Sequence, residues 1–209
     1  MKTILITGFE TWREEKYNPT VDLAREFEGK VIDGYRVRSE VLPVSFQKVR
    51  DSLPKLILKL RPSIIIHMGL APRASVILIE RVAINLMDAR VPDNDGYKPV
   101  DEPIFPDAPV AYFSTLPTRR IVEVLRKRGI PSALSYSAGT FLCNCALFVS
   151  LHTIHTYGLN TLAGFVHVPY TPKQAAEKQL VASMCMHLLL EGINVTIREC
   201  IKALSEKKS

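Results

Sequence analysis

The stretch Ala133-Leu-Ser-Tyr-Ser-Ala-Gly-Thr-Phe-Leu-Cys-Asn-Cys-Ala-Leu-Phe148 decides the fold of this chain. Its first four residues have the character of a strand, Ser137-Ala138-Gly139-Thr140 is typical of a tight turn, and the pattern from Phe141 onward is helical. The stretch therefore predicts a strand, a turn and a helix, with the Cys143 sulfur in the first helical turn. Unpaired backbone N–H groups and the positive end of the helix dipole favour a thiolate at that position.

Strands alternate with helices along the rest of the chain. Hydrophobic runs predict strands at residues 2–7, 39–44, 63–68, 76–84, 132–137 and 161–168. Helical spacing and capping residues predict helices at 21–27, 46–59, 118–128, 140–157 and 172–191. Several strands are nearly continuous in Val, Ile and Leu, which is typical of a sheet covered on both faces. We therefore expect an α/β fold, a three-layer α/β/α sandwich with an open, twisted, mainly parallel (mixed) sheet, in one domain over residues 1–209.

Functional sites in such folds form beyond the carboxyl ends of the strands. Gly8-Phe9, Gly69-Leu70, Ser137-Ala138-Gly139 and His167-Val168-Pro169 all follow expected strands, so we expect them on one rim of the sheet. Residues 88–115 form the longest irregular stretch, and a loop of that length in a compact domain is usually functional.

Composition limits the classes of function. The chain has 209 residues, 47% of them hydrophobic, which suffices for one sizeable core. Its net charge is +6, but basic and acidic residues are interleaved, as in Arg13-Glu14-Glu15-Lys16, so we expect no nucleic-acid partner. Hydrophobic stretches are too short to cross a bilayer, and the amino terminus lacks the pattern of a signal peptide. We expect a cytoplasmic protein with no membrane partner.

Neither a metal nor a cofactor is indicated. The pair Cys143-x-Cys145 lacks the usual spacing of zinc ligands and has no second ligand pair nearby. His152 and His155 lie three residues apart without a neighbouring carboxylate, which is more often a packing or surface arrangement. No glycine-rich nucleotide-binding motif occurs anywhere in the chain.

Three residues supply the parts of a cysteine hydrolase. Cys143 is a candidate nucleophile, His167 closes a hydrophobic run and is a candidate base, and Glu80 is the one charge after Val76-Ile-Leu-Ile79. Each has a structural alternative, because cysteine and strand-end histidine are often ordinary core residues. A carboxylate within an aliphatic run, however, is costly to bury without a partner. The coincidence of the three favours a catalytic interpretation.

Several motifs, in order along the chain, resemble the pyrrolidone carboxyl peptidase (pyroglutamyl peptidase I) family. The segment from Ile130 to Asn144 is similar to the family's cysteine motif, and Gly69 to Asn85 to its glutamate motif, except that Leu78 stands where a small hydroxyl residue is usual. Further similar segments are Ile6-Thr-Gly-Phe9, Asn18-Pro-Thr20, Ala89 to Gly96 and Gly164 to Pro172. The resemblance spans nearly the whole chain.

The resemblance implies a cysteine exopeptidase that removes an amino-terminal L-pyroglutamyl residue from peptides through a thioester. It implies Cys143 as nucleophile, His167 as general acid and base, and Glu80 as the carboxylate that orients the imidazole. It further implies that Arg90 stabilises the oxyanion. Substrate-binding residues implied by the resemblance are Phe9, Trp12, Asn18 and Phe141. Members of the family often associate, so a homo-oligomer, a dimer or a tetramer, is expected, with the segment 182–186 at an interface and the pairing of Cys185 open.

The chain departs from the family in the loop after the first strand. The family usually has Gly-Phe-x-Pro-Phe-Gly-Gly, whereas this chain has Gly8-Phe-Glu-Thr-Trp-Arg-Glu14. The loss of one proline and two glycines changes the backbone angles open to the loop, and the larger Trp12 indole narrows the expected pocket.

Two other functions remain open from the residues. One is another cysteine hydrolase of α/β fold, such as a glutamine-amidotransferase-like enzyme, which would act on free glutamine or carbonyl compounds. The second is a binding protein that keeps the fold without turnover, an alternative suggested by the altered Trp12 loop.

Overall fold

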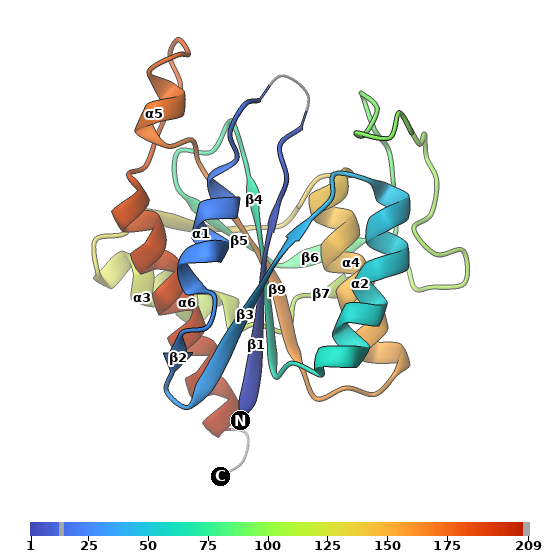
Figure 1. Cartoon of the computed structure of the whole chain (residues 1–209), viewed down its shortest axis with the longest axis horizontal. Helices are drawn as coiled ribbons and strands as arrows, with labels where there is room; N and C mark the ends of the chain where they lie inside the picture. Colours follow the sequence, from blue (N-terminus) through green and yellow to red (C-terminus); the bar gives the residue numbers. More distant parts are fainter. Residues whose placement is uncertain (13–14, 207–209) are drawn as a thin grey trace.

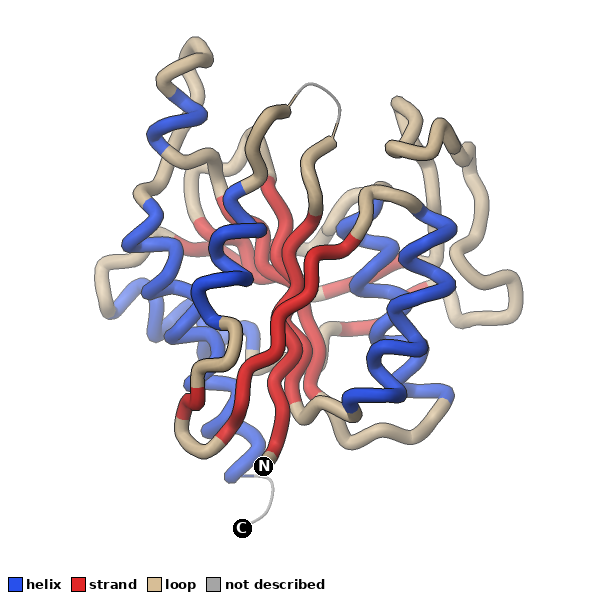
Figure 2. Tube along the Cα trace, viewed as in Figure 1, coloured by secondary structure: helices blue, strands red, loops and turns tan. Residues whose placement is uncertain are grey.

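A seven-stranded sheet forms the middle of the molecule in the computed structural model, which describes residues 1–12 and 15–206 (Figures 1 and 2). Its strands lie in the order β2-β3-β1-β4-β9-β5-β8. In chain order they are β1 (Lys2–Phe9), β2 (Val31–Ile32), β3 (Tyr35–Leu42), β4 (Ile64–Leu70), β5 (Ile77–Glu80), β8 (Ser132–Ser135) and β9 (Leu162–Val168).

The sheet is mixed but mainly parallel. Strands β3, β1, β4 and β9 run in one direction, each parallel to its neighbour. Strand β5 is antiparallel to β9 and parallel to β8, and the short β2 is antiparallel to β3. The expected sheet type is confirmed.

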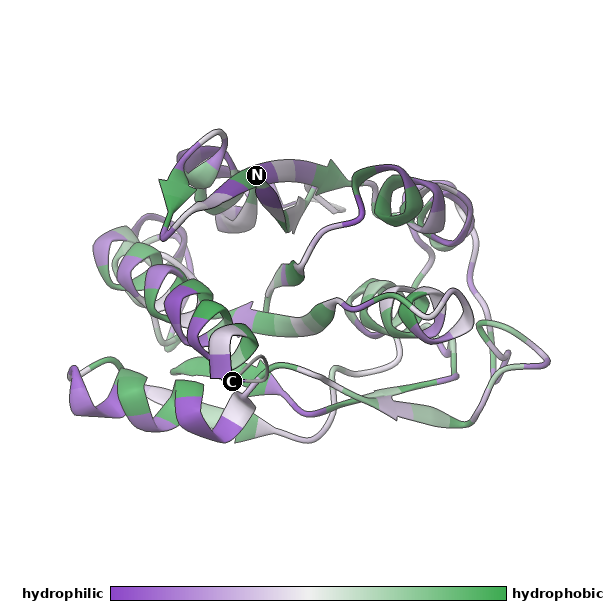
Figure 3. Ribbon diagram, turned by 90° about the horizontal axis from the view of Figure 1, so that it is seen from below, coloured by the Kyte–Doolittle hydropathy of each residue, from purple (hydrophilic) through white to green (hydrophobic). Residues whose placement is uncertain are grey.

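Helices cover both faces of the sheet. Helices α1 (Pro19–Phe27), α3 (Thr118–Lys127) and α6 (Met186–Glu206) pack on one face, and α2 (Phe46–Leu60) and α4 (Leu142–Thr156) on the other. A two-stranded sheet of β6 (Val82–Ile84) and β7 (Ala111–Phe113) contacts α4, and the short α5 (Pro172–Ala175) follows β9. Viewed from below, the helices carry alternating hydrophilic and hydrophobic residues (Figure 3). The three-layer architecture is as predicted.

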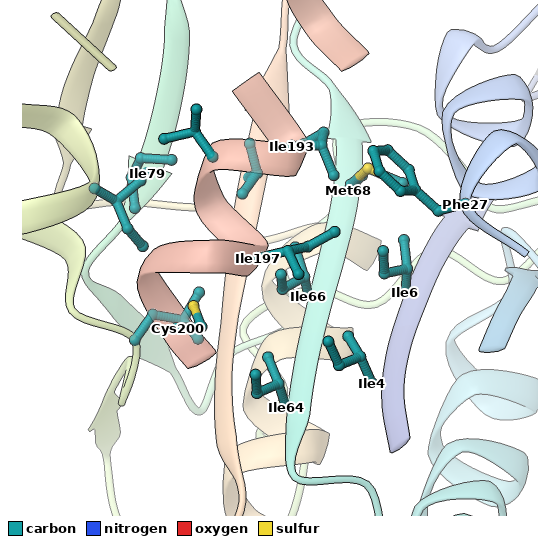
Figure 4. Packing of buried hydrophobic residues seen from close by; sticks show 14 of the residues in the cluster. Ile4, Ile6, Phe27, Ile64, Ile66, Met68, Ile79, Ile193, Ile197 and Cys200 are labelled. Carbon is teal, nitrogen blue, oxygen red and sulfur yellow. The ribbon is translucent and has the colours of Figure 1, made fainter. Parts of the chain in front are cut away.

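Strand alternation divides the core between the two faces. Ile4, Ile6, Ile64 and Ile66 face α6, and Figure 4 shows Ile193, Ile197 and Cys200 of that helix packed among them. The residues between them face α2 and α4, among them Leu5, Ile65 and Phe165. Full burial of one such side chain contributes about 1.5–3 kcal/mol.

The expected strand at 76–84 is in fact two strands in two sheets. The Arg81 N–H donates to the Ser135 carbonyl, which continues β5 along β8, whereas the Arg81 carbonyl accepts from Ser114 N–H. The backbone therefore changes partners at Arg81, and β6 continues against β7. Strand β7 lies within the stretch 88–115 that was expected to be irregular.

The expected helix at 172–191 is also wrong. Helix α5 ends at Ala175, and α6 begins only at Met186 and continues to Glu206. Between them Leu180 has a left-handed φ of 53°, and Met184 N–H donates to the Tyr170 carbonyl at 2.8 Å. The Leu180 backbone does not continue a right-handed helix, and the Met184 bond joins the end of this segment to the residues just beyond β9.

The four segments that were expected on one rim of the sheet do not all lie there. Because β8 is antiparallel to β9 through β5, Ser137-Ala138-Gly139 leaves the sheet in the opposite direction from the ends of β1, β4 and β9. The chain returns to the rim at Phe141, where the first residues of α4 share a cavity with Phe9, Gly69 and Leu70. Within residues 1–12 and 15–206, no helix has the length and hydropathy that a membrane span requires.

Candidate active site

Strand alternation brings two of the three candidate residues to the face that α4 covers. His167 shares its face of β9 with Phe165, and Glu80 is the last residue of β5. In the antiparallel register Leu78 lies opposite His167, so Glu80 is its diagonal neighbour on the same face. Glu80 Oε1 lies 2.7 Å from His167 Nδ1.

The charge state of His167 depends on its neighbours. Burial alone would lower the pKa of His167, but the Cys143 charge, a hydrogen bond with Cys143 and the interaction with Glu80 outweigh it and raise the pKa to about 9. Since Nδ1 is engaged by Glu80, Nε2 is the nitrogen available to the sulfur. The three side chains therefore form a connected chain of sulfur, imidazole and carboxylate, in which an imidazolium is favoured at neutral pH.

The first turn of α4 positions Cys143, the candidate nucleophile. Phe141 is the N-cap in an extended conformation, and the first intrahelical bond runs from Cys145 N–H to the Phe141 carbonyl. The N–H groups of Leu142 and Cys143 precede this bond, so they are free to act as donors near the sulfur. Gly69 leaves room for the sulfur, because a Cβ at that position would lie 2.9 Å from Cys143 Sγ.

Asn144 fixes this turn against β6, a role that the sequence reasoning missed. Its side chain accepts from Ile84 N–H at 2.9 Å and donates to the carbonyls of Ile84 at 2.8 Å and Leu86 at 3.1 Å. The residue is buried, so these bonds satisfy the whole amide without water. A polar residue beside the nucleophile in an otherwise hydrophobic helix was the available signal.

A cavity of about 290 Å³ opens beside Cys143. Most of its wall is hydrophobic, with Phe9, Trp12, Val44, Leu70 and Phe141 among the lining residues. The Trp12 and Phe141 rings are 5.0 Å apart, and Phe46 meets Phe141 edge-on at 5.2 Å. The structure thus places three of the four expected substrate-binding residues as aromatic walls around the thiol.

Asn18, the fourth, lines the same cavity but is engaged in structure. Asn18 is the N-cap of α1, and its Oδ1 accepts from the backbone N–H and the hydroxyl of Thr20. Its Nδ2 donates to the Glu10 carbonyl at 3.3 Å. Asn18 therefore holds the loop after β1 in place. Any contact with substrate would use only its remaining hydrogen-bonding capacity.

The unusual loop after β1 is tied to residues 92–94. Trp12 Nε1 donates to the Pro92 carbonyl at 3.2 Å, and Asn94 Nδ2 donates to the Thr11 carbonyl and to Glu10 Oε1, both at 3.0 Å. These bonds restrain Glu10, Thr11 and Trp12 against residues 92–94. Arg13 and Glu14, which complete the departure from the family pattern, lie outside the described residues.

Arg90 is not brought into the cavity. Its side chain is exposed and makes no hydrogen bond or ion pair with any residue that the structure describes. The backbone nearby is anchored, because Asp88 N–H donates to the Thr140 carbonyl and the Thr140 hydroxyl donates to the Asp88 carbonyl. Arg90 thus follows a segment that is joined to the turn before the nucleophile, and its role at the oxyanion stays a prediction.

The four cysteines differ sharply in environment. Cys143 is partly exposed, Cys185 is exposed, and Cys145 and Cys200 are buried. Burial raises the pKa of Cys145 to about 12, more than the nearby Arg50 charge lowers it, so its thiol stays protonated. Cys185 lies in the irregular segment before α6, and not in a helix as expected.

The described part of the chain holds no cluster of His, Cys, Asp or Glu suited to a metal. His152 Nδ1 lies 3.0 Å from the Tyr112 hydroxyl, and the ring stacks on Phe148, so its surroundings are those of a packing residue.

His67 is a second buried histidine that the sequence reasoning did not assign. Its ring nitrogens lie 2.7 Å from the Thr7 hydroxyl and 2.8 Å from the Ser150 hydroxyl, and burial lowers its pKa to about 3. It is therefore neutral at physiological pH, and it joins β1, β4 and α4 beneath Phe165, which packs at 4.6 Å from the His167 ring.

Comparison with known proteins identifies similar chains over the full length. The family profile described as pyroglutamyl peptidase matches residues 2–203. A pyrrolidone-carboxylate peptidase of Pyrococcus furiosus is 46% identical over 96% of this chain and 99% of its own length, and one of Thermococcus litoralis is 43% identical over 100% and 97%. The solved pyrrolidone carboxyl peptidase structure from Thermococcus litoralis superposes with a TM-score of 0.96, covering 99% of this chain and 96% of that one.

Proposed function

The chain belongs to the pyroglutamyl peptidase family, and from this we propose that it removes the amino-terminal pyroglutamyl residue of peptides by attack of Cys143. The observation that carries the proposal is the contact of Cys143 with His167, which in turn bonds Glu80 at 2.7 Å, beside a largely hydrophobic cavity. The reaction is that of a cysteine peptidase.

The cavity suits the chemistry of a pyroglutamyl residue. Its lactam has two hydrophobic faces, one N–H and one carbonyl, and carries no ammonium group that would need a carboxylate partner. Aromatic walls from Phe9, Trp12 and Phe141 match the ring faces. Bound there, the ring presents its exocyclic carbonyl to the sulfur.

Attack by the Cys143 thiolate forms a carbon–sulfur bond and moves the carbonyl electron pair onto oxygen. The free N–H groups of the first turn of α4 stabilise this oxyanion, and Arg90 adds its charge if the exposed side chain turns inward. As the oxyanion collapses, the His167 imidazolium protonates the leaving amine and the carbon–nitrogen bond breaks. The pyroglutamyl group remains on sulfur as a thioester.

Water completes the reaction. His167, now neutral, takes a proton from water, and the resulting hydroxide attacks the thioester and releases pyroglutamate and the thiolate. Glu80 keeps Nδ1 protonated and so presents Nε2 to the sulfur, the amine and the water in turn.

Hydrolysis of a fluorogenic pyroglutamyl amide by the purified protein tests the proposal. We expect Cys143→Ala and Cys143→Ser to lose nearly all activity, and Cys145→Ala, one residue away, to retain most of it because that thiol is buried and protonated. Alkylation of the wild-type thiol should abolish turnover. Full activity of Cys143→Ala would refute the nucleophile.

Substrate controls separate this function from the alternatives. A prolyl amide lacks the lactam carbonyl and should be cleaved far more slowly, whereas equal turnover would contradict the proposed cavity. Turnover of free glutamine would favour an amidotransferase-like enzyme, and protection of the thiol by pyroglutamate without turnover would favour a binding protein. The oligomeric state and the cytoplasmic location remain predictions.

A further inference from the structure

A second cavity, which we call the α5 groove, adjoins the active-site cavity. It measures about 480 Å³, and Trp12, Glu15 and Tyr17 line both cavities. Its remaining lining residues are Lys16, Gln174, Glu177 and Lys178. The two cavities therefore share one wall, formed by Trp12, Glu15 and Tyr17.

One side of the α5 groove is formed by residues that follow His167 in the chain, namely Gln174, Glu177 and Lys178. Beyond the end of β9, the Tyr170 hydroxyl donates to Glu15 Oε1 at 3.2 Å, and Gln174 Nε2 donates to the Tyr17 carbonyl at 3.1 Å. The walls of the active-site cavity formed by Val44 and Phe141 belong to the opposite side, next to α2 and α4. Figure 1 shows α5 on one side of β1 and these two helices on the other.

The proposed mechanism also places the two parts of the substrate, the pyroglutamyl ring and the leaving peptide, on different sides of the scissile bond. The lactam fills the hydrophobic cavity, and the leaving amine must lie on the His167 side because that imidazolium protonates it. We propose that the α5 groove binds the residues that follow pyroglutamate in the substrate peptide. This inference rests on the proposed function and assigns a binding site for the leaving peptide.

The chemistry of the groove fits a polar peptide of either charge. Glu15 and Glu177 balance Lys16 and Lys178, and Lys178 Nζ holds Glu15 at 2.8 Å while it lies over the Tyr170 ring at 5.0 Å. Such a wall offers donors and acceptors to peptide groups without a net charge that would exclude acidic or basic residues. We therefore expect the wild-type protein to accept both kinds of residue after pyroglutamate.

Charge reversal in the α5 groove tests the proposal. The substrates are two matched peptides with lysine or glutamate directly after pyroglutamate, and a pyroglutamyl aryl amide measured in the same preparation corrects for folded enzyme. Lys178→Glu changes the summed charge of the described lining residues from zero to −2. It should raise the lysine-to-glutamate ratio of kcat/KM roughly threefold to tenfold at low ionic strength. Glu177→Lys should move the ratio in the opposite direction, and high salt should weaken both effects.

Lys30→Glu is the matched control, because Lys30 also holds a glutamate, Glu26, at 2.8 Å but lies away from both cavities. It should leave the ratio unchanged. A ratio that moves by less than about twofold in both groove variants, or that moves equally in Lys30→Glu, would overturn the α5 groove as a binding site. Absence of hydrolysis of all three substrates by the wild-type protein would instead refute the proposed function.

Discussion

The His167 ring lies between Glu80, which engages Nδ1, and Cys143, which is a hydrogen-bond partner of the same ring. Glu80 is fully buried, and its Oε1 is engaged by His167. Burial opposes the charge on His167, but its interactions with Cys143 and Glu80 outweigh burial and raise its pKa, so the imidazolium is favoured. In the proposed mechanism this one residue is both the partner of the Cys143 sulfur and the proton donor to the leaving amine.

The pH profile should show this directly. The pKa of His167 is raised to about 9, above its ordinary 6.5, so the fold favours the protonated form. Its contribution to stability is complete below pH 6.5 and is lost as the pH rises through about 9, and kcat/KM should fall over the same alkaline range as the imidazolium is lost.

Glu80→Gln supplies the control for that assignment. Removing the carboxylate charge removes an interaction that raises the pKa of His167, so the alkaline limb should move to lower pH and the rate should fall by roughly 10- to 100-fold, less than with loss of the base itself. An alkaline limb that stays in place in Glu80→Gln would contradict the coupling between the two residues.

At the scale of elements, helix α4 is bonded to strand β6 and to the residues that follow it. The Asn144 amide bonds the backbone groups of Ile84 and Leu86, and the Thr140 hydroxyl bonds the Asp88 carbonyl. The segment after β6 therefore runs beside the turn that carries Cys143. The turn that carries Cys143 is therefore held from outside its own helix. Asn144 is a positioning residue in this arrangement, because its side chain contacts β6 and not the cavity.

We expect Asn144→Ala to lower kcat by roughly tenfold or more with little change in KM, because the sulfur is displaced while the aromatic walls remain. It should also lower stability by about 1–3 kcal/mol, since the Ile84 and Leu86 backbone groups are left unpaired. The rate of thiol alkylation per folded molecule gives an independent readout and should fall as well. Asn194→Ala on α6 is the control, and equal kcat losses in both variants would argue for a general effect on folding.

At the scale of the whole molecule, Arg120 joins two helices of the outer layer. Its Nε donates to Glu199 Oε2 at 2.6 Å and its Nη1 to Glu206 at 2.7 Å, while Lys202 donates to Glu199 Oε1 at 2.7 Å. Glu199 is buried, so α3 is tied to α6 through a carboxylate that depends on both cations. Burial would raise the pKa of Glu199, but the bonds from Lys202 and Arg120 outweigh it and lower the pKa.

Arg120→Ala should therefore lower the free energy of unfolding by about 1–3 kcal/mol at neutral pH, measured by urea denaturation. Because the pKa of Glu199 is lowered, its stabilising contribution is present above the ordinary pKa and is lost as the pH falls through the folded value. The difference from wild type should therefore shrink in acid. Arg198→Ala, which removes an exposed pair with Asp33, should cost no more than about 1 kcal/mol, and an equal loss would contradict the role of burial.

Local patterns predicted the layers and most elements, because continuous hydrophobic runs and capping residues are written in the sequence itself. They did not give the direction of β5 and β8 or the change of partner at Arg81. Both depend on backbone carbonyls and N–H groups of segments that are distant in the chain. The sequence predicted that Glu80 would orient His167, because a buried carboxylate needs a partner. Only the structure shows that the two residues are diagonal neighbours on antiparallel strands. The Asn144 bonds and the Trp12 bond to Pro92 are likewise contacts between segments 58 or more residues apart.

The four thiols differ in exposure, so their reactivity can be used to measure access to the active-site cavity. One sulfur is open to solvent, two are sealed in the core, and Cys143 is reached beside the aromatic cavity. A ladder of alkylating reagents of increasing bulk would label the surface sulfur at every size and the two core sulfurs only after unfolding. The size at which Cys143 stops reacting would then measure the width of the entrance that Trp12 and Phe141 leave open.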